Sequence, residues 1–446
     1  MTIPGPKSTP TVQSFHWYAR PLDFMRECVE KYGDPFRIEL SRFGEHACFS
    51  APMALRDIFT THADKLDAGL GNEPLRALLG DHSLLTLDGR DHRRHRRLLK
   101  PAFHGPQLSR YADKMLAVAC AAVAAWPAGE PVAVYPRLLE LSLKIILETI
   151  FGFRDPERKR DLELLIHDLL HHSNVSLSFF ETFADSSLQG ESPTDTLEWL
   201  RQRSSRLDAL LYQEIESRRA ETGVVASDVL MMLLKARDEA GEPLEAVEVH
   251  DELLTLLVAG HETAAAALAW ALVFLAQNPA AQKRAAEEAM GDVDDASRLA
   301  GSGYLQAVCS ESLRMMPVIP VVSRMAQVDL EIDGHPISAG TRVTPCIYLT
   351  HHRADIWHEP ERFRPSRFLE RIPSPYQFLP FGGGARRCIG AAFAMREMAI
   401  VLGVVLSRFE VRLASDPPRP LRTALLMTPS EGARLVLEPR PQLPQR

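Results

Sequence analysis

The stretch Phe381-Gly-Gly-Gly-Ala-Arg-Arg-Cys388-Ile-Gly390 decides the fold of this chain. Its glycines permit tight turns and the close approach of a large flat ligand. Arg386 and Arg387 place positive charge beside the Cys388 sulfur, which favours the thiolate over the thiol. Residues 391–398 follow with a helical pattern, so the dipole at the start of that helix favours an anionic sulfur further. A single thiolate on such a loop is what an axial haem ligand requires.

A lone cysteine packs in a protein core more often than it binds a metal, so Cys388 alone is a weak indication. The spacing of Phe381, Gly384, Arg386, Cys388 and Gly390 resembles the haem-binding signature of the cytochrome P-450 family, and every fixed position is filled. The resemblance implies haem b (iron protoporphyrin IX) as cofactor, with the Cys388 thiolate as its axial metal ligand. It also implies that Phe381 and Arg386 contact the cofactor.

Composition predicts a globular protein that does not depend on disulfides. The 446 residues are 46% hydrophobic, which is enough to bury a large core. The net charge of −7 argues against a general nucleic-acid binder. None of the six cysteines pair as CxxC, which is typical of reduced thiols in a cytoplasmic protein. Residues 1–7 carry no apolar run of membrane-spanning length, so we expect no membrane anchor, although a truncated chain would look the same.

Helical periodicity dominates from residue 91 onward, and strand patterns are short. A short helix is expected at 22–32, a hairpin at 36–40 and 47–49, and an irregular loop over a pocket at 66–88. Further helices are expected at 91–101, 107–126, 136–153, 160–172, 193–221, 247–278, 279–291, 303–316 and 391 to about 408. Strands are expected at 328–332 and 342–348, with the Asp333-Gly334 turn between them, and at 409–413 and 433–437.

No linker, repeat or low-complexity run divides the chain, so we expect a single domain over residues 1–446 with an extended segment at 1–15. The fold class predicted from the elements is mainly α with small β-sheets. The resemblance implies the cytochrome P-450 fold. In that fold the haem lies between the long central helix at 247–278 and the helix that follows the cysteine loop.

The central helix contains the polar residues His261, Glu262 and Thr263 directly after Gly260. A glycine inside a helix costs about 1 kcal/mol relative to alanine, so its presence requires a reason. Periodicity alone favours an exposed polar stripe, and the zinc motif HExxH fails because Ala265 occupies the second ligand position. The segment resembles the oxygen-activation motif of the same family. The resemblance implies that Thr263 hydrogen-bonds dioxygen, that Glu262 helps to deliver protons, and that Gly260 leaves room for dioxygen.

Two sets of charged residues match further family positions. Glu311 and Arg314 lie one helical turn apart and alone indicate only a surface pair of small energy. The resemblance adds Arg367 and implies a triad that holds the cysteine loop from behind, with a folding role. His92, Arg96, Arg324 and Arg386 match residues that bind the haem propionates. Arginine suits this role because its planar fork meets a carboxylate bidentately.

The resemblance implies a soluble, bacterial-type monooxygenase that inserts one atom of dioxygen into a hydrophobic substrate by hydroxylation or epoxidation. Aliphatic segments at 66–88, 160–200, 253–264, 318–322 and 425–427 would line the pocket, although each alone could be ordinary core. A terpenoid, fatty acid, steroid or polyketide-like substrate fits such a lining. Electrons from NAD(P)H would arrive through a separate ferredoxin or flavodoxin and its reductase, and a monomer is expected. A peroxide-driven enzyme and a non-catalytic haem-binding protein remain alternatives.

Overall fold

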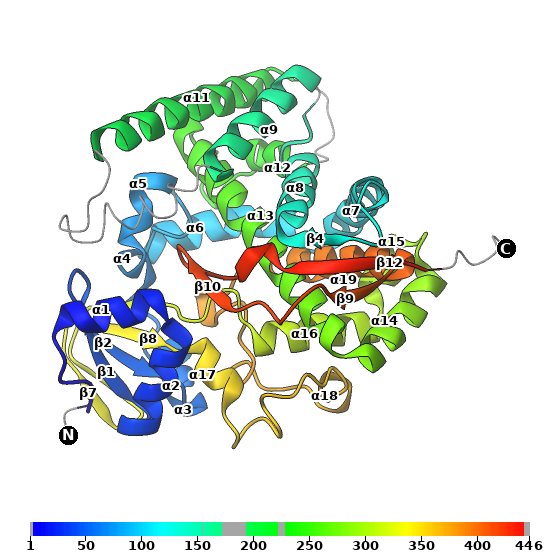
Figure 1. Cartoon of the computed structure of the whole chain (residues 1–446). Helices are drawn as coiled ribbons and strands as arrows, with labels where there is room; N and C mark the ends of the chain where they lie inside the picture. Colours follow the sequence, from blue (N-terminus) through cyan, green and yellow to red (C-terminus); the bar gives the residue numbers. More distant parts are fainter. Residues whose placement is uncertain (1–2, 154, 172–192, 222–227, 441–446) are drawn as a thin grey trace.

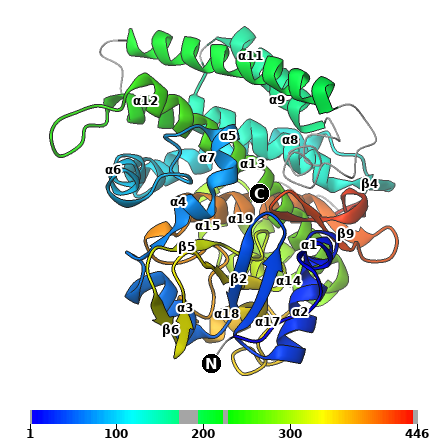
Figure 2. The ribbon, with the colours of Figure 1, turned by 90° about the vertical axis from the view of Figure 1, so that its left-hand side faces the viewer.

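The computed structural model describes the backbone of residues 3–153, 155–171, 193–221 and 228–440, and the side chains of these ranges except 167–171, 193–204 and 292. A large helical body carries a five-stranded sheet at one side, near the N-terminus (Figures 1 and 2). The fold is therefore mainly α with small β-sheets, as the sequence predicts.

The helix α13 (Ala246–Gln277) runs through the middle of the helical body (Figure 1). At its start, the Glu248 carboxylate accepts a hydrogen bond from the Glu245 backbone N–H at 2.7 Å, which closes the first turn. Apolar residues then occupy almost every face, so the helix is buried on all sides rather than along one stripe. By length and composition it could cross a membrane, but most of it is buried inside the protein.

Helices α8 (Val134–Ile146) and α19 (Ala391–Arg408) pack against α13, and α7 (Pro106–Ala124) packs against α8 and α19. Together these helices form the core that positions the site. The other helices are α1 (Pro10–Ala19), α2 (Pro21–Tyr32), α3 (Pro52–Arg56), α4 (Ala68–Gly71), α5 (Arg76–Leu79), α6 (Gly89–Leu99), α9 (Pro156–His171), α11 (Pro193–Arg219), α12 (Val229–Lys235), α14 (Pro279–Asp292), α15 (Ala296–Gly301), α16 (Gly303–Met315), α17 (Ile347–His352) and α18 (Arg367–Glu370).

The largest sheet has the strand order β1-β2-β8-β5-β3, with β2 and β8 parallel and the other pairs antiparallel. Its strands are β1 (Phe36–Leu40), β2 (Gly44–Phe49), β3 (Leu66–Asp67), β5 (Arg324–Ala326) and β8 (Arg342–Pro345). The smaller sheets contain β4 (Pro131–Ala133), β6 (Leu330–Ile332), β7 (His335–Ile337), β9 (Phe409–Leu413), β10 (Pro420–Thr423), β11 (Leu426–Pro429) and β12 (Arg434–Pro439).

Four sequence predictions about local structure were wrong in detail. Helix α1 begins at Pro10, because a proline fits the first turn of a helix, so the segment expected to be extended to residue 15 is extended only before α1. The region 66–88 contains β3, α4 and α5 in place of an irregular loop. The Asp333-Gly334 turn joins β6 to β7 and not to the strand at 342. The strand expected at 342–348 ends at Pro345, and residues 347–348 already belong to the helix α17.

Candidate functional site

The loop before α19 wraps around the Cys388 side chain. The Cys388 backbone N–H donates to the Phe381 carbonyl at 2.8 Å, which closes the loop on itself. Gly384 adopts a φ of +63°, and a Cβ there would lie 2.3 Å from the Phe59 carbonyl oxygen. A Cβ on Gly383 would lie 2.7 Å from the Phe59 ring. Close packing on Phe59 therefore requires these two glycines, a reason that the sequence did not reveal.

The Cys388 side chain is accessible to solvent although protein surrounds it on nearly all sides. Its sulfur therefore faces an opening inside the molecule. Burial raises the pKa of the Cys388 thiol, and the Gly390 N–H and the charges of Arg387 and Arg96 oppose this effect without reversing it. The charge of Arg387 favours the thiolate, as the sequence predicts, but desolvation by burial is the larger effect and sets the net direction of the pKa. A bound metal ion would have to supply the remaining stabilisation of the anion.

Four basic side chains from three separate parts of the chain meet at this place. They are His92 and Arg96 on α6, Arg324 at the start of β5, and Arg386 in the cysteine loop. Burial lowers the pKa of His92 to about 3, and the nearby charges of Arg386, Arg96 and Arg324 add to this effect. Burial and the charge of Arg386 likewise lower the pKa of Arg324 to about 10. The four residues that the family resemblance assigns to the haem propionates thus lie near one another.

This basic cluster contains more positive than negative charge. Arg386 donates to the Leu84 carbonyl and is paired with the Asp88 carboxylate. Within the described ranges, however, Arg324 and Arg96 form no ion pair, and each donates only to a backbone carbonyl, that of Ser323 or Arg387. Buried guanidinium groups are costly without a counter-charge. The cluster and the Cys388 sulfur therefore fit a flat metal complex that carries carboxylates at its edge, which is the chemistry of haem.

Helix α13 places the predicted oxygen-activation residues on one turn. The Thr263 hydroxyl donates to the Ala259 carbonyl at 2.7 Å. The Glu262 carboxyl lies beside the Tyr135 side chain of α8, and burial raises its pKa while Tyr135 opposes that effect. The two side chains of the predicted acid–hydroxyl pair therefore have different partners. A carboxyl that carries its proton at neutral pH can act as a proton donor.

Gly260 contacts the neighbouring helix. A Cβ at this position would lie 2.7 Å from the Ile146 Cδ1 atom of α8. The structure thus gives a packing reason for this glycine, whereas the sequence resemblance suggested room for dioxygen. The close approach of α8 and α13 depends on the missing side chain.

The predicted triad is present and almost completely buried. Arg314 Nε lies 2.8 Å from Glu311 Oε2, and Arg367 Nε lies 2.9 Å from Glu311 Oε1. Arg314 also donates to the His351 carbonyl at 2.8 Å, and Arg367 to the His358 carbonyl at 2.9 Å. One carboxylate thus joins α16 to the start of α18. The surface-pair interpretation of Glu311 and Arg314 is wrong, because both side chains have no exposed surface.

Sequence reasoning missed two residues that organise this site. Phe59 supports the cysteine loop, and nothing in its sequence surroundings indicates that contact. Asp88 accepts hydrogen bonds from the backbone N–H groups of Ala68, Gly69 and Leu70 and also pairs with Arg386. The sequence did offer one signal for Asp88: it is an acidic residue directly before a strongly basic helix.

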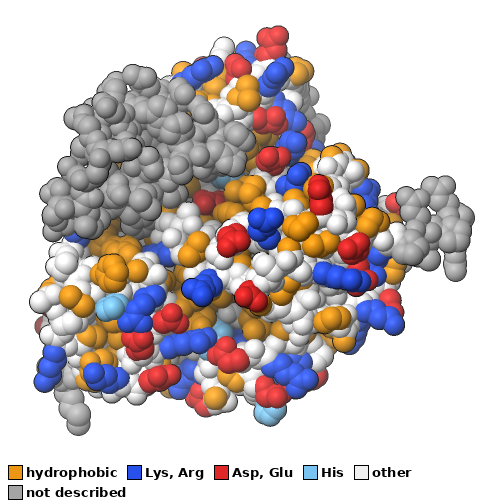
Figure 3. Space-filling model, viewed as in Figure 1, with side chains coloured by type: hydrophobic (Ala, Val, Ile, Leu, Met, Phe, Trp, Pro, Cys, Tyr) orange, Lys and Arg blue, Asp and Glu red, His pale blue; other side chains and the backbone are white. Residues whose placement is uncertain are grey.

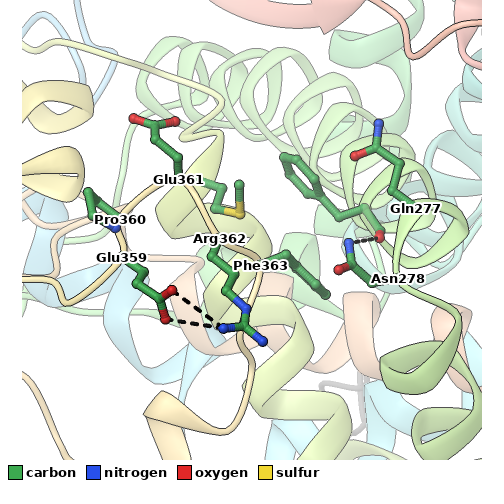
Figure 4. A pocket seen from close by; sticks show the side chains of 9 residues that line it. Gln277, Asn278, Glu359, Pro360, Glu361, Arg362 and Phe363 are labelled. Atoms are coloured by element: carbon green, nitrogen blue, oxygen red, sulfur yellow. Dashed lines mark hydrogen bonds and ion pairs between the residues drawn. The ribbon is translucent and has the colours of Figure 1, made fainter.

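A second hollow, of about 560 Å³, lies away from this site (Figure 4). Its lining includes Gln277 and Asn278 at the end of α13 and Glu359 and Arg362, which form an ion pair. Gln277 is roughly 21 Å along the helix from Thr263, at 1.5 Å per residue. The hollow is therefore remote from Thr263.

Comparison with known proteins identifies the family. The family model "Cytochrome P450" matches residues 3–437. This chain belongs to the cytochrome P450 family. It is 38% identical to cytochrome P450 135B1 of Mycobacterium tuberculosis over 97% of this chain and 90% of that protein. It is 34% identical to cytochrome P450 135A1 of the same species over 99% of this chain and 96% of that protein.

A solved structure shows the same fold. The cyanobacterial CYP120A1, with retinoic acid bound, superimposes with a TM-score of 0.83 at 27% identity and covers 98% of this chain and 99% of its own. The cytochrome P450 fold expected from the sequence is thus confirmed. Membership of the family makes the protein a haem-thiolate monooxygenase, an oxidoreductase that uses a cysteine-ligated haem, dioxygen, a hydrophobic substrate and separate redox partners.

Proposed function

We propose that Cys388 is the axial ligand of haem b and that His92, Arg96, Arg324 and Arg386 bind its propionates. The observation that carries this proposal is the convergence of the accessible Cys388 sulfur with an under-compensated basic cluster. When bound, the haem supplies activation of dioxygen, and an electron-rich thiolate ligand assists O–O cleavage. Glu311, Arg314 and Arg367 hold the cysteine loop in place from the other side.

In this proposal two residues of α13, Glu262 and Thr263, deliver protons to the oxygen substrate. In this proposal the Thr263 hydroxyl turns from the Ala259 carbonyl toward the oxygen substrate and donates a hydrogen bond there. Burial raises the pKa of Glu262, which favours the protonated form that can donate a proton. Burial and the neighbouring Glu262 raise the pKa of Tyr135, so solvent and not Tyr135 returns a proton to Glu262 after each transfer. Phe381 packs near the cofactor on the cysteine side, beneath Arg387 at 5.9 Å.

The substrate we propose is a terpenoid, fatty acid, steroid or polyketide-like molecule that is hydroxylated or epoxidised. Buried aliphatic side chains in two of the expected lining segments support it, namely Leu253 and Leu257 on α13 and Val318. Of the expected segment 160–200, residues 172–192 lie outside the described residues. The retinoic acid in CYP120A1 is itself an apolar chain with one carboxylate, which agrees with this class.

We further propose a cytoplasmic, monomeric, single-domain enzyme that is supplied from NAD(P)H by a ferredoxin or flavodoxin and its reductase. On the face in Figure 3 the described acidic, basic and hydrophobic side chains are interspersed, which favours a soluble surface. The Glu262-Thr263 pair favours dioxygen over peroxide as oxidant, because a peroxide-driven enzyme needs no proton relay.

Substrate-induced spectral change is the experiment that tests this function. The purified protein is titrated with hydrophobic compounds of the four classes while the Soret band is recorded. Compounds that shift the band are then incubated with a surrogate ferredoxin, its reductase and NADPH. We expect an oxygenated product that requires dioxygen. Product formation with hydrogen peroxide alone, and none with dioxygen and electrons, would favour the peroxide-driven alternative.

A further inference from the structure

A buried cluster of ionisable side chains joins α6 to the first turns of α13. His95 Nδ1 lies 2.8 Å from Glu252 Oε1, and His95 Nε2 lies 3.1 Å from Glu248 Oε1. Glu252 has no exposed side-chain surface, and His95 has 2%. Arg94 Nη1 lies 2.7 Å from Glu248 Oε1, so Glu248 contacts both His95 and a less buried arginine. Arg94 Nε also lies 2.7 Å from Asp238.

The position of His95 on α6 connects this cluster to the proposed haem site. His95 lies one turn after His92 and directly before Arg96, the two α6 residues of the basic cluster. Helix α6 has only eleven residues and must point His92 and Arg96 in one fixed direction. Two carboxylates of α13 contact the two ring nitrogens of His95. These contacts fix the rotation of α6 about its axis and its distance from α13.

Helix α13 also holds the segment 80–88 that precedes α6. Asp251 accepts a hydrogen bond from the His82 N–H at 2.9 Å, and the Thr255 hydroxyl donates to the Ser83 hydroxyl at 2.7 Å. Arg386 donates to the Leu84 carbonyl of this segment at 3.1 Å. Helix α13, the segment 80–88, α6 and the cysteine loop are thus one connected polar network.

We propose that His95 and Glu252 are positioning residues for the cofactor, which hold α6 so that His92 and Arg96 reach the haem carboxylates. The cofactor part of this inference rests on the proposed function. His95 and Glu252 hold α6 in this position as long as the proton that they share stays bound. Two groups favour the ionised form of the Glu252 carboxyl group: the His95 ring and the Leu84 backbone N–H.

The sign of the pH dependence follows from both partners. Burial opposes charge on His95, but the hydrogen bonds and charges of Glu252 and Glu248 outweigh it and raise the His95 pKa. Burial raises the pKa of Glu252, which Asp251 reinforces and His95 opposes. Raised pKa values mean that the folded arrangement is favoured at low pH. The contribution of His95 is complete below about pH 6.5, its unfolded value, and is lost as pH rises through the higher folded pKa.

Haem transfer to excess apomyoglobin tests the inference on the holoenzyme. We expect wild-type haem loss to accelerate as pH rises from about 6 to 9. Glu252→Gln should lose haem roughly tenfold faster at pH 6.5 and show a weaker pH dependence, because a buried charge has lost its partner. Asp208→Asn is the matched control, since Asp208 pairs with another buried histidine of α13, His250, at 3.0 Å. Equal haem-loss rates and pH profiles in wild type and Glu252→Gln would overturn the inference.

Hydrogen exchange separates this inference from the proposed function. In Glu252→Gln we expect amides of 80–88 and α6 to exchange about tenfold faster, with α14 and α16 unchanged, whether or not haem is bound. His95→Gln should behave the same, and the double variant should add little to either single one. Local loosening in a protein without haem-binding capacity would contradict only the proposed function. Unchanged exchange in α6 would contradict the positioning role.

Discussion

Glu311 Oε1 lies 2.9 Å from Arg367 Nε, a contact between side chains 56 residues apart in the sequence. With Arg314 on its other oxygen, Glu311 is the single anion that balances two buried guanidinium groups. Removing one partner from a buried ion pair leaves the other charges uncompensated.

Glu311→Gln should therefore destabilise the protein by about 3–5 kcal/mol, as buried ion pairs do when one partner is removed. Urea unfolding measures this change, and the haem content of the purified variant reports the state of the cysteine loop. The matched control is Glu410→Gln, because Glu410 pairs with Arg412 on the surface at 3.0 Å. That control should change stability by less than about 1 kcal/mol. A normal haem content and stability in Glu311→Gln would argue against a structural role for the triad.

Gly260→Ala tests the packing explanation of this glycine. Alanine favours helix by about 1 kcal/mol, but its Cβ would overlap Ile146 Cδ1, and overpacking costs about 1–3 kcal/mol. We expect reduced thermal stability and lower product formation. Ile146→Val removes the Cδ1 atom and should restore both in the double variant. If Ile146→Val restores stability but not activity, then room for dioxygen also requires the glycine.

Thr263→Ala should separate electron use from product formation. The variant lacks the hydroxyl that now donates to Ala259, so protons would reach dioxygen without control. We expect the ratio of product to NAD(P)H consumed to fall by roughly an order of magnitude, with a matching rise in hydrogen peroxide. Thr263→Ser keeps the hydroxyl and should retain most of the coupling. Unchanged coupling in Thr263→Ala would exclude Thr263 from the proton path.

Glu397 makes stability depend on pH. This carboxyl lies on α19, is completely buried, and accepts a hydrogen bond from the Ser142 hydroxyl of α8 at 2.6 Å. Burial raises its pKa from 4.5 to about 8. The folded state thus holds a proton that the unfolded state releases, so stability is complete below pH 4.5 and falls as pH rises to about 8.

Glu397→Gln should remove this dependence, because the amide is neutral at every pH and keeps the shape. We expect the wild type to lose up to about 1.4 kcal/mol per pH unit in this window relative to the variant. Urea unfolding at about pH 5 and pH 8 measures the difference. Parallel pH profiles of the two proteins would contradict the assignment of a buried neutral carboxyl.

Long helices and ligand motifs could be predicted from the sequence because their signals are local. The helix at 247–278 was expected within one residue of the observed α13, since its apolar run and capping residues lie inside the segment. The Cys388 motif could likewise be recognised because all its fixed positions lie within residues 381–390. The triad contact between Glu311 and Arg367 was found only through the family resemblance, because no local pattern joins residues so far apart.

Contacts with distant partners could not be predicted. The short helix α4 depends on Asp88 and on the neighbouring strand β5, and no sequence periodicity indicates it. The direction of the Cys388 pKa depends on how deeply the loop is buried, which composition does not reveal. The same is true of Gly260, whose neighbour Ile146 comes from another helix.

The absorption spectrum of the protein reduced with dithionite and exposed to carbon monoxide tests the central claim most directly. Because a cysteine thiolate is the proposed axial ligand, we expect a strongly red-shifted Soret band. Cys388→Ser should lack that band while the other five cysteines remain. A haem-free wild type, an unshifted band, or a red-shifted band that persists in Cys388→Ser would contradict the assignment of Cys388.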